Sequence, residues 1–126
     1  MPDNHMFINL SNHPSSKWTE SQIKAAEQYG EIVDMQFPNV DPAGDTTYID
    51  DLANEYAQKV NYITNGTPSV VHIMGEMTLT FAIIIKLQKM NFNCVCSTTE
   101  RIVEDLDNGE KKVLFNFVKF RNYAKM

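Results

Sequence analysis

The sequence predicts an α/β fold: a Rossmann-like parallel sheet flanked by helices, with a C-terminal antiparallel β-hairpin. Three features predict it. Short apolar runs alternate with amphipathic segments over residues 6–96, the connections between them are short, and an Asp-Asn-Gly turn separates two further β-rich runs. Strand–helix alternation of this kind indicates parallel strands joined by right-handed crossovers. A length of 126 residues fits one domain, so we expect residues 1–126 to form a single Rossmann-like unit.

Strands and helices are expected to alternate from the start of the chain. The second helix has apolar residues at helical spacing, and the third strand is almost continuously apolar, which is typical of a strand covered on both faces. The expected strands and helices are, in chain order, 6–10, 19–29, 31–36, 47–63, 69–74, 78–90 and 92–96.

The first helix has the clearest start and end signals. Thr19 as N-cap and Gln22 three residues later form a capping box, and Trp18 is placed to pack on Ile23. Gly30 follows in the position that commonly ends a helix. These signals place the helix directly after the first polar turn.

The pattern changes after residue 101. Residues 102–106 and 113–120 predict two antiparallel strands, and Asp107-Asn108-Gly109 lies between them. An Asn-Gly pair favours a type I′ turn, in which both central residues have positive φ. The chain is therefore expected to end in a β-hairpin.

Four polar turns are expected at one edge of the sheet, because the carboxyl ends of parallel strands meet there. In open α/β sheets this edge is where ligands bind. The turns carry hydroxyls, amides, one histidine and one arginine, which suits a phosphate-bearing or nucleotide-like ligand. They cover residues 11–16, 37–42, 75–78 and 97–101.

Composition and charge exclude several functional classes. The formal net charge is −5, whereas binding long DNA or RNA through its phosphates requires a basic face. The chain lacks both the Gly-x-Gly-x-x-Gly fingerprint and the Walker lysine motif, which argues against nicotinamide enzymes and P-loop NTPases. No signal peptide is visible, and the longest apolar stretch, 81–85, is too short to cross a bilayer. We therefore expect a cytoplasmic protein that contacts no membrane and no long nucleic acid.

The two cysteines do not indicate a metal site. Cys94 and Cys96 are expected on one face of a strand, as small buried hydrophobes in a reducing compartment. A disulfide at that spacing is strained, and two cysteines alone lack the other ligands of a zinc site. We expect neither a bound metal nor a cofactor.

The first polar turn carries the most chemistry. Ser11, Asn12 and Ser15 offer hydrogen-bond donors, and His13 can donate, accept or transfer a proton near neutral pH. The next helix starts just downstream, so its free backbone N–H groups are expected beside the same space. The alternative is that these residues only build a turn and a cap, which Ser, Asn and Pro do routinely.

The later turns offer further candidates. Gly75 permits a close backbone approach, and Glu76 either contacts a ligand or caps the following helix. In the fourth turn Arg101 is expected to pair with phosphate, the alternative being a weak surface ion pair. His72, in the middle of an apolar strand, is expected to be a satisfied core histidine rather than a functional one. The hydroxyls expected to cradle phosphate are those of Ser97, Thr98 and Thr99.

A set of short motifs follows one order along nearly the whole chain: Asn9 to Pro14, Gln22, Tyr29-Gly30, Gly75-Glu76, Ser97 to Arg101, and Phe117 to Tyr123. In this order they resemble the small stand-alone relatives of CARF (CRISPR-associated Rossmann fold) domains, which are found beside type III CRISPR systems. The resemblance implies a single CARF-like domain that binds a cyclic oligoadenylate second messenger, usually as a homodimer. Several such proteins are ring nucleases, which cleave the messenger.

The resemblance also implies site residues. It puts Ser11, Asn12 and His13 in a first ligand loop, and Arg121 near the end of the tail. Gly75 and Glu76 match the turn after the third strand. The turn before the hairpin is matched by Ser97, Thr98, Thr99 and Arg101. Because related ring nucleases share no single catalytic set, the identity of the catalytic residue is not carried over.

The residues and the resemblance are compatible with three functions. The first is a metal-independent ring nuclease acting on cyclic tetra-adenylate, in which a ribose 2′-hydroxyl attacks the adjacent phosphate. His13 would then be general base or acid, and Arg101 would stabilise charge on phosphorus. The second is a sensor or sponge of the same fold that binds the ring without cutting it. The third is an interaction protein whose sheet and hairpin only dimerise.

Overall fold

The structure is a computed structural model that describes residues 5–126. It has an α/β architecture with one sheet of strand order β2-β1-β3-β4-β5, parallel except for β5, which runs antiparallel to β4. The strands are β1 Met6–Ser11, β2 Glu31–Gln36, β3 Ser69–Met74, β4 Asn93–Asp105 and β5 Lys111–Asn122. The helices are α1 Glu20–Glu27, α2 Thr46–Thr64 and α3 Met77–Lys89, with a short 3-10 turn over Ser15–Lys17. The predicted fold class is confirmed.

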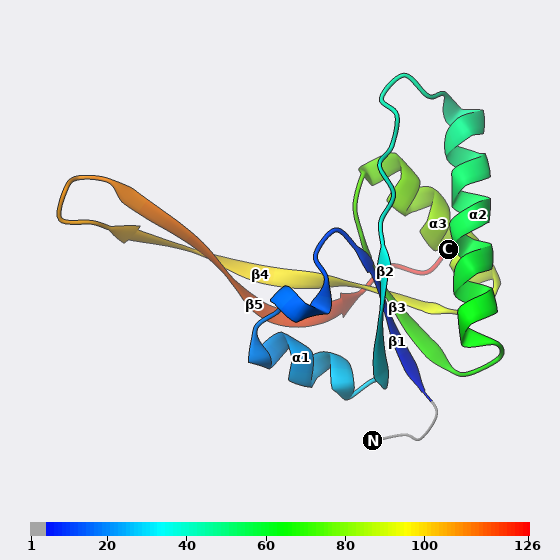
Figure 1. The fold of residues 1–126 in the computed structure, drawn as a ribbon, viewed down its shortest axis with the longest axis horizontal. Helices are drawn as coiled ribbons and strands as arrows, with labels where there is room; N and C mark the ends of the chain where they lie inside the picture. The colour runs from blue at the N-terminus through cyan, green and yellow to red at the C-terminus, as the bar shows by residue number, and fades with distance from the viewer. Residues whose placement is uncertain (1–4) are drawn as a thin grey trace.

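The helices form a layer on each side of the sheet, α1 on one face and α2 with α3 on the other (Figure 1). Alternate residues of β1 serve the two layers, as expected for a pleated strand. Phe7 packs in an aromatic-rich cluster with Ala26 of α1 and Phe120, whereas Ile8 and Leu10 belong to the larger core under α2 and α3. No helix in residues 5–126 combines the length and the apolar character needed to cross a membrane.

Each helix begins at a side chain that accepts a hydrogen bond from the backbone of its first turn. Thr19 accepts from Gln22 N at α1, Asp45 from Tyr48 N at α2, and Glu76 from Leu79 N at α3. These caps satisfy backbone donors that have no partner inside a helix. The three helices begin within one residue of the starts predicted from the sequence.

The hairpin formed by β4 and β5 extends far beyond the rest of the sheet (Figure 1). Its pairing runs from Val95 opposite Asn122 out to Asp105 opposite Lys111. The expectation of a polar turn over residues 97–101 is therefore wrong, since these residues lie inside β4. The physical reason is that β5 supplies antiparallel backbone partners for them, so the chain does not need to turn at the carboxyl edge of the sheet.

The hairpin turn also differs from the prediction. Gly109 has φ +84°, but Asn108 does not have positive φ, so the turn is not type I′. Instead the Asn108 side chain accepts from the backbone N–H of Glu110, and Leu106 N donates to Glu110 O. An asparagine that bonds its own backbone two residues on is a common way to build such a turn.

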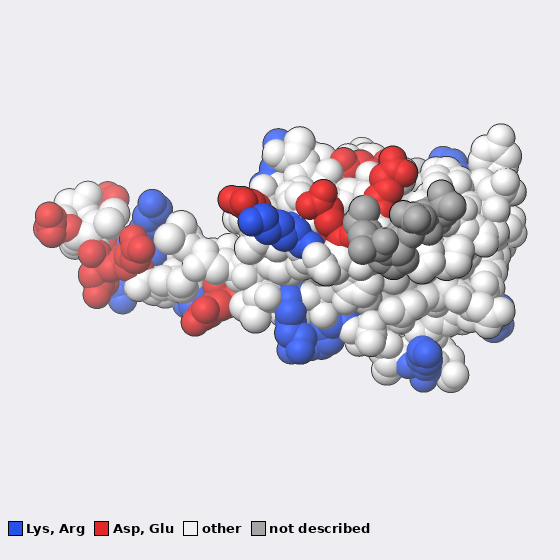
Figure 2. Space-filling view, turned by 90° about the horizontal axis from the view of Figure 1, so that it is seen from below, with Lys and Arg blue, Asp and Glu red and all other residues white. Residues whose placement is uncertain are grey.

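The end of this arm is charged. Figure 2 shows acidic side chains gathered at the tip of the projecting hairpin. Four acidic residues stand there against two lysines: Glu104, Asp105, Asp107 and Glu110, with Lys111 and Lys112. A net negative tip repels nucleic-acid phosphates.

Candidate functional site

A polar cavity of about 610 Å³ opens at the carboxyl edge of the sheet. Its walls come from the loop after β1, the start of α1, the end of β3, the middle of β4 and the part of β5 that pairs with it. The lining residues are Ser11, Asn12, His13, Lys17, Trp18, Thr19, Gln22, His72, Met74, Gly75, Ser97, Thr99, Phe115 and Phe117. The cavity thus combines one exposed histidine, one lysine and several hydroxyls and amides with three aromatic side chains.

Asn9, buried in the middle of β1, organises the floor of this cavity. Its amide nitrogen donates to the carbonyl of His13 (2.9 Å) and to Asp34 Oδ1 (2.8 Å). Its amide oxygen accepts from Ser11 Oγ (2.8 Å) and lies 2.8 Å from His72 Nδ1. One buried amide therefore joins the His13 loop, β2 and β3.

Asp34 anchors the first loop from β2. Ser15 donates to it twice, through its backbone N–H (3.0 Å) and its hydroxyl (2.8 Å). Burial acts to raise the pKa of Asp34, but the hydrogen bonds from Asn9 and Ser15 together outweigh it and hold the pKa below its usual value. The Ser15 hydroxyl is consequently committed to holding the loop. Asp34 was not among the predicted residues, although a charged residue inside an apolar strand was a visible signal.

His72 lies at the end of this network nearest the aromatic cluster. Its ring packs against Phe7, Trp18 and Phe120, with centroid distances of 6.0, 5.5 and 5.4 Å. Its Nε2 lies 2.7 Å from Ser97 Oγ. Burial, with a smaller contribution from the charge of nearby His13, lowers the pKa of His72 to about 4. Both ring nitrogens are satisfied, as expected of a core histidine, but His72 also lines the cavity, which the sequence analysis did not foresee.

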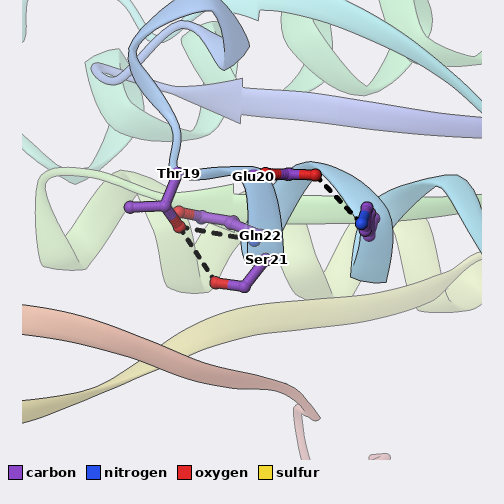
Figure 3. Close-up of polar contacts among 5 residues, drawn as sticks. Thr19, Glu20, Ser21 and Gln22 are labelled. Atoms are coloured by element: carbon purple, nitrogen blue, oxygen red, sulfur yellow. Dashed lines mark hydrogen bonds and ion pairs between the residues drawn. The ribbon is translucent and has the colours of Figure 1, made fainter.

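Gln22 connects the first helix to the same network. Figure 3 shows the first turn of α1, in which Thr19 Oγ1 accepts from Gln22 N (3.4 Å) and lies 3.1 Å from Ser21 Oγ. The Gln22 side chain reaches across to β4 and donates to Ser97 Oγ (3.1 Å). The Thr19 half of the predicted capping box is thus confirmed, while the Gln22 side chain serves the cavity.

The cavity brings together six of the predicted residues: Ser11, Asn12, His13, Gly75, Ser97 and Thr99. Two of these have further roles. The Asn12 side chain accepts from Gln36 Nε2 (3.1 Å), which holds the loop to the end of β2. At Gly75 a Cβ atom would lie 2.4 Å from the ring of buried Phe37, so the close approach expected there is made by a core side chain.

Five predicted residues do not line the cavity: Ser15, which is bonded to Asp34, and Glu76, Thr98, Arg121 and Arg101. Glu76 caps α3, accepting from Leu79 N and Thr78 Oγ1 at 2.7 Å each, and these bonds lower the pKa of Glu76. Thr98 donates to the Lys119 carbonyl and accepts from its N–H. Arg121 lies directly opposite Cys96 in the β4–β5 ladder. Cys96 is on the same face of β4 as Cys94, which belongs to the core under α2 and α3, so Arg121 is on the face of the sheet away from the cavity.

Arg101 lies on the projecting hairpin opposite Phe115. Phe115 and Thr99 line the cavity. Arg101 is on the same face of β4 as Thr99, but it is exposed and does not line the cavity. The cation that lines the cavity is Lys17, in the 3-10 turn after His13. Sequence reasoning missed Lys17 because it assigned the positive charge of the site to the fourth turn.

Two further observations concern ligands of other kinds. Within residues 5–126, no group of three or more His, Cys, Asp or Glu side chains is placed to hold a metal ion. A second cavity of about 490 Å³ lies between α3 and the C-terminal residues and is lined mainly by apolar side chains, among them Met77, Phe81 and Ile84. The convergent polar groups are found in the cavity beside His13.

Comparison with known proteins identifies a family but no activity. A family model described as "Uncharacterized protein MJ1673 family" matches residues 5–121. No curated protein and no solved structure gives a significant match to this chain.

Proposed function

The chain belongs to the Uncharacterized protein MJ1673 family, and we propose, from the motif resemblance to CARF-like proteins together with the composition of the site, that it binds a cyclic oligoadenylate, with cyclic tetra-adenylate as the favoured ring. We propose further that it cleaves the ring without metal, by attack of a ribose 2′-hydroxyl on the adjacent phosphate, and so switches off type III CRISPR signalling. The observation that carries the proposal is the single cavity in which His13, Lys17, hydroxyls and amides meet the aromatic side chains of Trp18, Phe115 and Phe117.

The composition of the cavity suits an oligonucleotide ring. Aromatic side chains offer stacking surfaces for bases, and Phe115 is 64% exposed although it is a large apolar residue. Polar groups on the inner wall suit ribose and phosphate. The volume of about 610 Å³ is in the range of small-molecule sites and holds part of a ring in each subunit. A two-fold dimer, presenting the same loops twice, matches a rotationally symmetric ring.

In the cleavage reaction, a 2′-hydroxyl held in line with the leaving oxygen needs a base, an acid and charge stabilisation. His13 is exposed in the cavity and its side chain has no hydrogen-bond partner among the described residues, so it is the group proposed for proton transfer. Lys17 is placed to stabilise negative charge on the phosphate within one subunit. Arg101, expected in that role, takes part only where a second copy brings its hairpin to the cavity.

The alternative proposal is a non-catalytic sensor or sponge that binds the ring. The internal bonding of the first loop favours it, because Ser11 donates to Asn9 and Ser15 donates to Asp34. These hydroxyls are therefore unavailable for catalysis, and acid–base chemistry depends on His13 alone.

The test is to incubate the purified protein with cyclic tetra-adenylate and cyclic hexa-adenylate in the presence of a metal chelator, and to separate the products by chromatography. Linear adenylates ending in 2′,3′-cyclic phosphate support the nuclease. Intact ring together with a rise in melting temperature supports the sponge. Neither cleavage nor a thermal shift with either ring refutes both and leaves an interaction protein.

A further inference from the structure

We propose that Ser97 acts in the cavity only as a hydrogen-bond acceptor, and that it therefore recognises a donor of the ligand, the ribose 2′-hydroxyl, rather than a phosphate oxygen. The inference rests on the proposed function for the identity of the ligand. The directions of the hydrogen bonds follow from contacts within the protein, beginning at Asn9.

The first step is the orientation of the Asn9 amide. One end of the amide faces the His13 carbonyl and the Asp34 carboxylate, at 2.9 and 2.8 Å. Both partners are acceptors, so this end must be the NH₂ group, and exchanging nitrogen and oxygen would set three acceptors against one another. The oxygen of Asn9 consequently faces His72.

The second step is the tautomer of His72. Its Nδ1 lies 2.8 Å from the Asn9 oxygen, which already accepts from Ser11 and has no proton to give. The proton of the ring must therefore be on Nδ1. Because burial and His13 lower the pKa of His72 to about 4, the ring is neutral near pH 7 and its Nε2 carries no proton. Nε2 is then an acceptor.

The third step is the hydrogen-bond inventory of Ser97. A serine hydroxyl has one proton and two lone pairs. The proton goes to His72 Nε2, 2.7 Å away, and Gln22 Nε2 donates to one lone pair from 3.1 Å. One lone pair remains at a residue that lines the cavity. Turning the hydroxyl toward a phosphate would leave the buried Nε2 of His72 without a partner, which is costly. The Ser97 hydroxyl therefore has no proton to offer a phosphate, contrary to the expectation that it cradles one.

A cyclic oligoadenylate has two kinds of donor, the 2′-hydroxyl and the exocyclic amine of adenine. Of the cavity-lining residues, His72 is buried and Ser97 is half-buried, whereas Phe115 is exposed and leaves its ring free for a base to stack on. This arrangement favours the ribose for Ser97. Each nucleotide of the ring has its own 2′-hydroxyl, so Ser97 and His13 can act on different ones.

The experiment is calorimetric titration with three rings of equal size: cyclic tetra-adenylate, its all-2′-deoxy analogue, and a ring in which purine replaces adenine. All proteins carry His13→Ala so that the ribose ring stays intact. Loss of one such hydrogen bond is expected to weaken binding of the deoxy ring about tenfold. Adding Ser97→Ala should reduce this ratio to about one. Adding Ser69→Ala, whose hydroxyl donates to Thr67 O at the other end of β3, should leave the ratio unchanged.

The other outcomes separate this inference from the proposed function. Equal binding of the ribose and deoxy rings by the protein with intact Ser97 overturns the inference while the proposed function stands, and this comparison does not depend on the folding of a Ser97 variant. If the Ser97→Ala variant still binds the ribose ring more tightly than the deoxy ring, then a group other than Ser97 accepts from the 2′-hydroxyl. If the purine ring binds more weakly than the adenine ring, and Ser97→Ala makes the two affinities equal, then the donor that Ser97 recognises is the exocyclic amine and not the 2′-hydroxyl. Failure of all three rings to bind refutes the proposed function itself, and with it the ligand class assumed here.

Discussion

Removing the titrating group at position 72 should flatten the acid side of the stability profile. In the folded protein burial lowers the pKa of His72 from 6.5 to about 4, so between these values the unfolded chain binds a proton that the folded protein does not. Stability then rises with pH across this window and is lost as the pH falls from about 6.5 toward 4. Above pH 7 His72 is largely neutral in both the folded protein and the unfolded chain, so it no longer lowers the free energy of unfolding there.

The magnitude follows from the two pKa values. Because one pKa unit corresponds to about 1.4 kcal/mol, the penalty is about 2 kcal/mol at pH 5 and about 3 kcal/mol at pH 4. His72→Gln suits the comparison, because a glutamine amide can donate to Asn9 and accept from Ser97 without titrating. The variant is expected to be less stable at pH 7 but to lose less stability on acidification.

The assay is urea unfolding of both proteins at pH 7, 6 and 5. The quantity compared is the change in the free energy of unfolding of each protein with pH. Carboxylates titrate in both proteins, so the difference between the two profiles isolates position 72. Parallel profiles for wild type and His72→Gln would show that His72 is protonated as readily in the folded protein as in the unfolded chain. His72 would then have no fixed neutral tautomer, and Ser97 would lose the acceptor to which its proton is assigned.

Other substitutions test packing, capping and catalysis. Gly75→Ala places a Cβ 2.4 Å from the ring of Phe37 and should destabilise the fold by about 1–3 kcal/mol in thermal or urea unfolding; an unchanged melting temperature would mean that the ring moves aside freely. Glu76→Ala removes the side-chain cap of α3 and should cost about 0.5–2 kcal/mol, without changing ring affinity, and weaker binding would return Glu76 to the site. His13→Ala should lower turnover of cyclic tetra-adenylate far more than affinity in single-turnover and binding assays, and cleavage at the parent rate would remove His13 from the mechanism. Arg101→Ala should lower both turnover and affinity, but only if the protein dimerises and the partner's hairpin reaches the cavity. An unchanged binding constant in a protein shown to dimerise would exclude Arg101 from the site.

Local patterns in the chain were sufficient for most of the fold. Thr19, Asp45 and Glu76 are capping side chains, and the helices begin at them because a cap acts on backbone donors within three residues. Strand β2 was predicted with the bounds that it has, and β3 likewise. The hairpin was predicted as well, but its reach was not. Whether Ser97 to Arg101 turn or continue as a strand depends on β5, whose partner residues stand up to 23 positions later in the chain.

The same distinction between local patterns and long-range contacts holds for the candidate site. The sequence by itself identified the His13 loop, because Ser, Asn, His and Pro in succession after a strand form a recognisable turn at a binding edge. Only the tertiary structure decided that Asp34 and Asn9 hold this loop, that Gln22 and His72 direct the Ser97 hydroxyl, and that Arg101 lies out on the arm. The reason is that caps and turns act within a few residues, whereas a hydrogen-bond network joins side chains 25 to 75 positions apart, and its direction is set by where four strands and a helix place them.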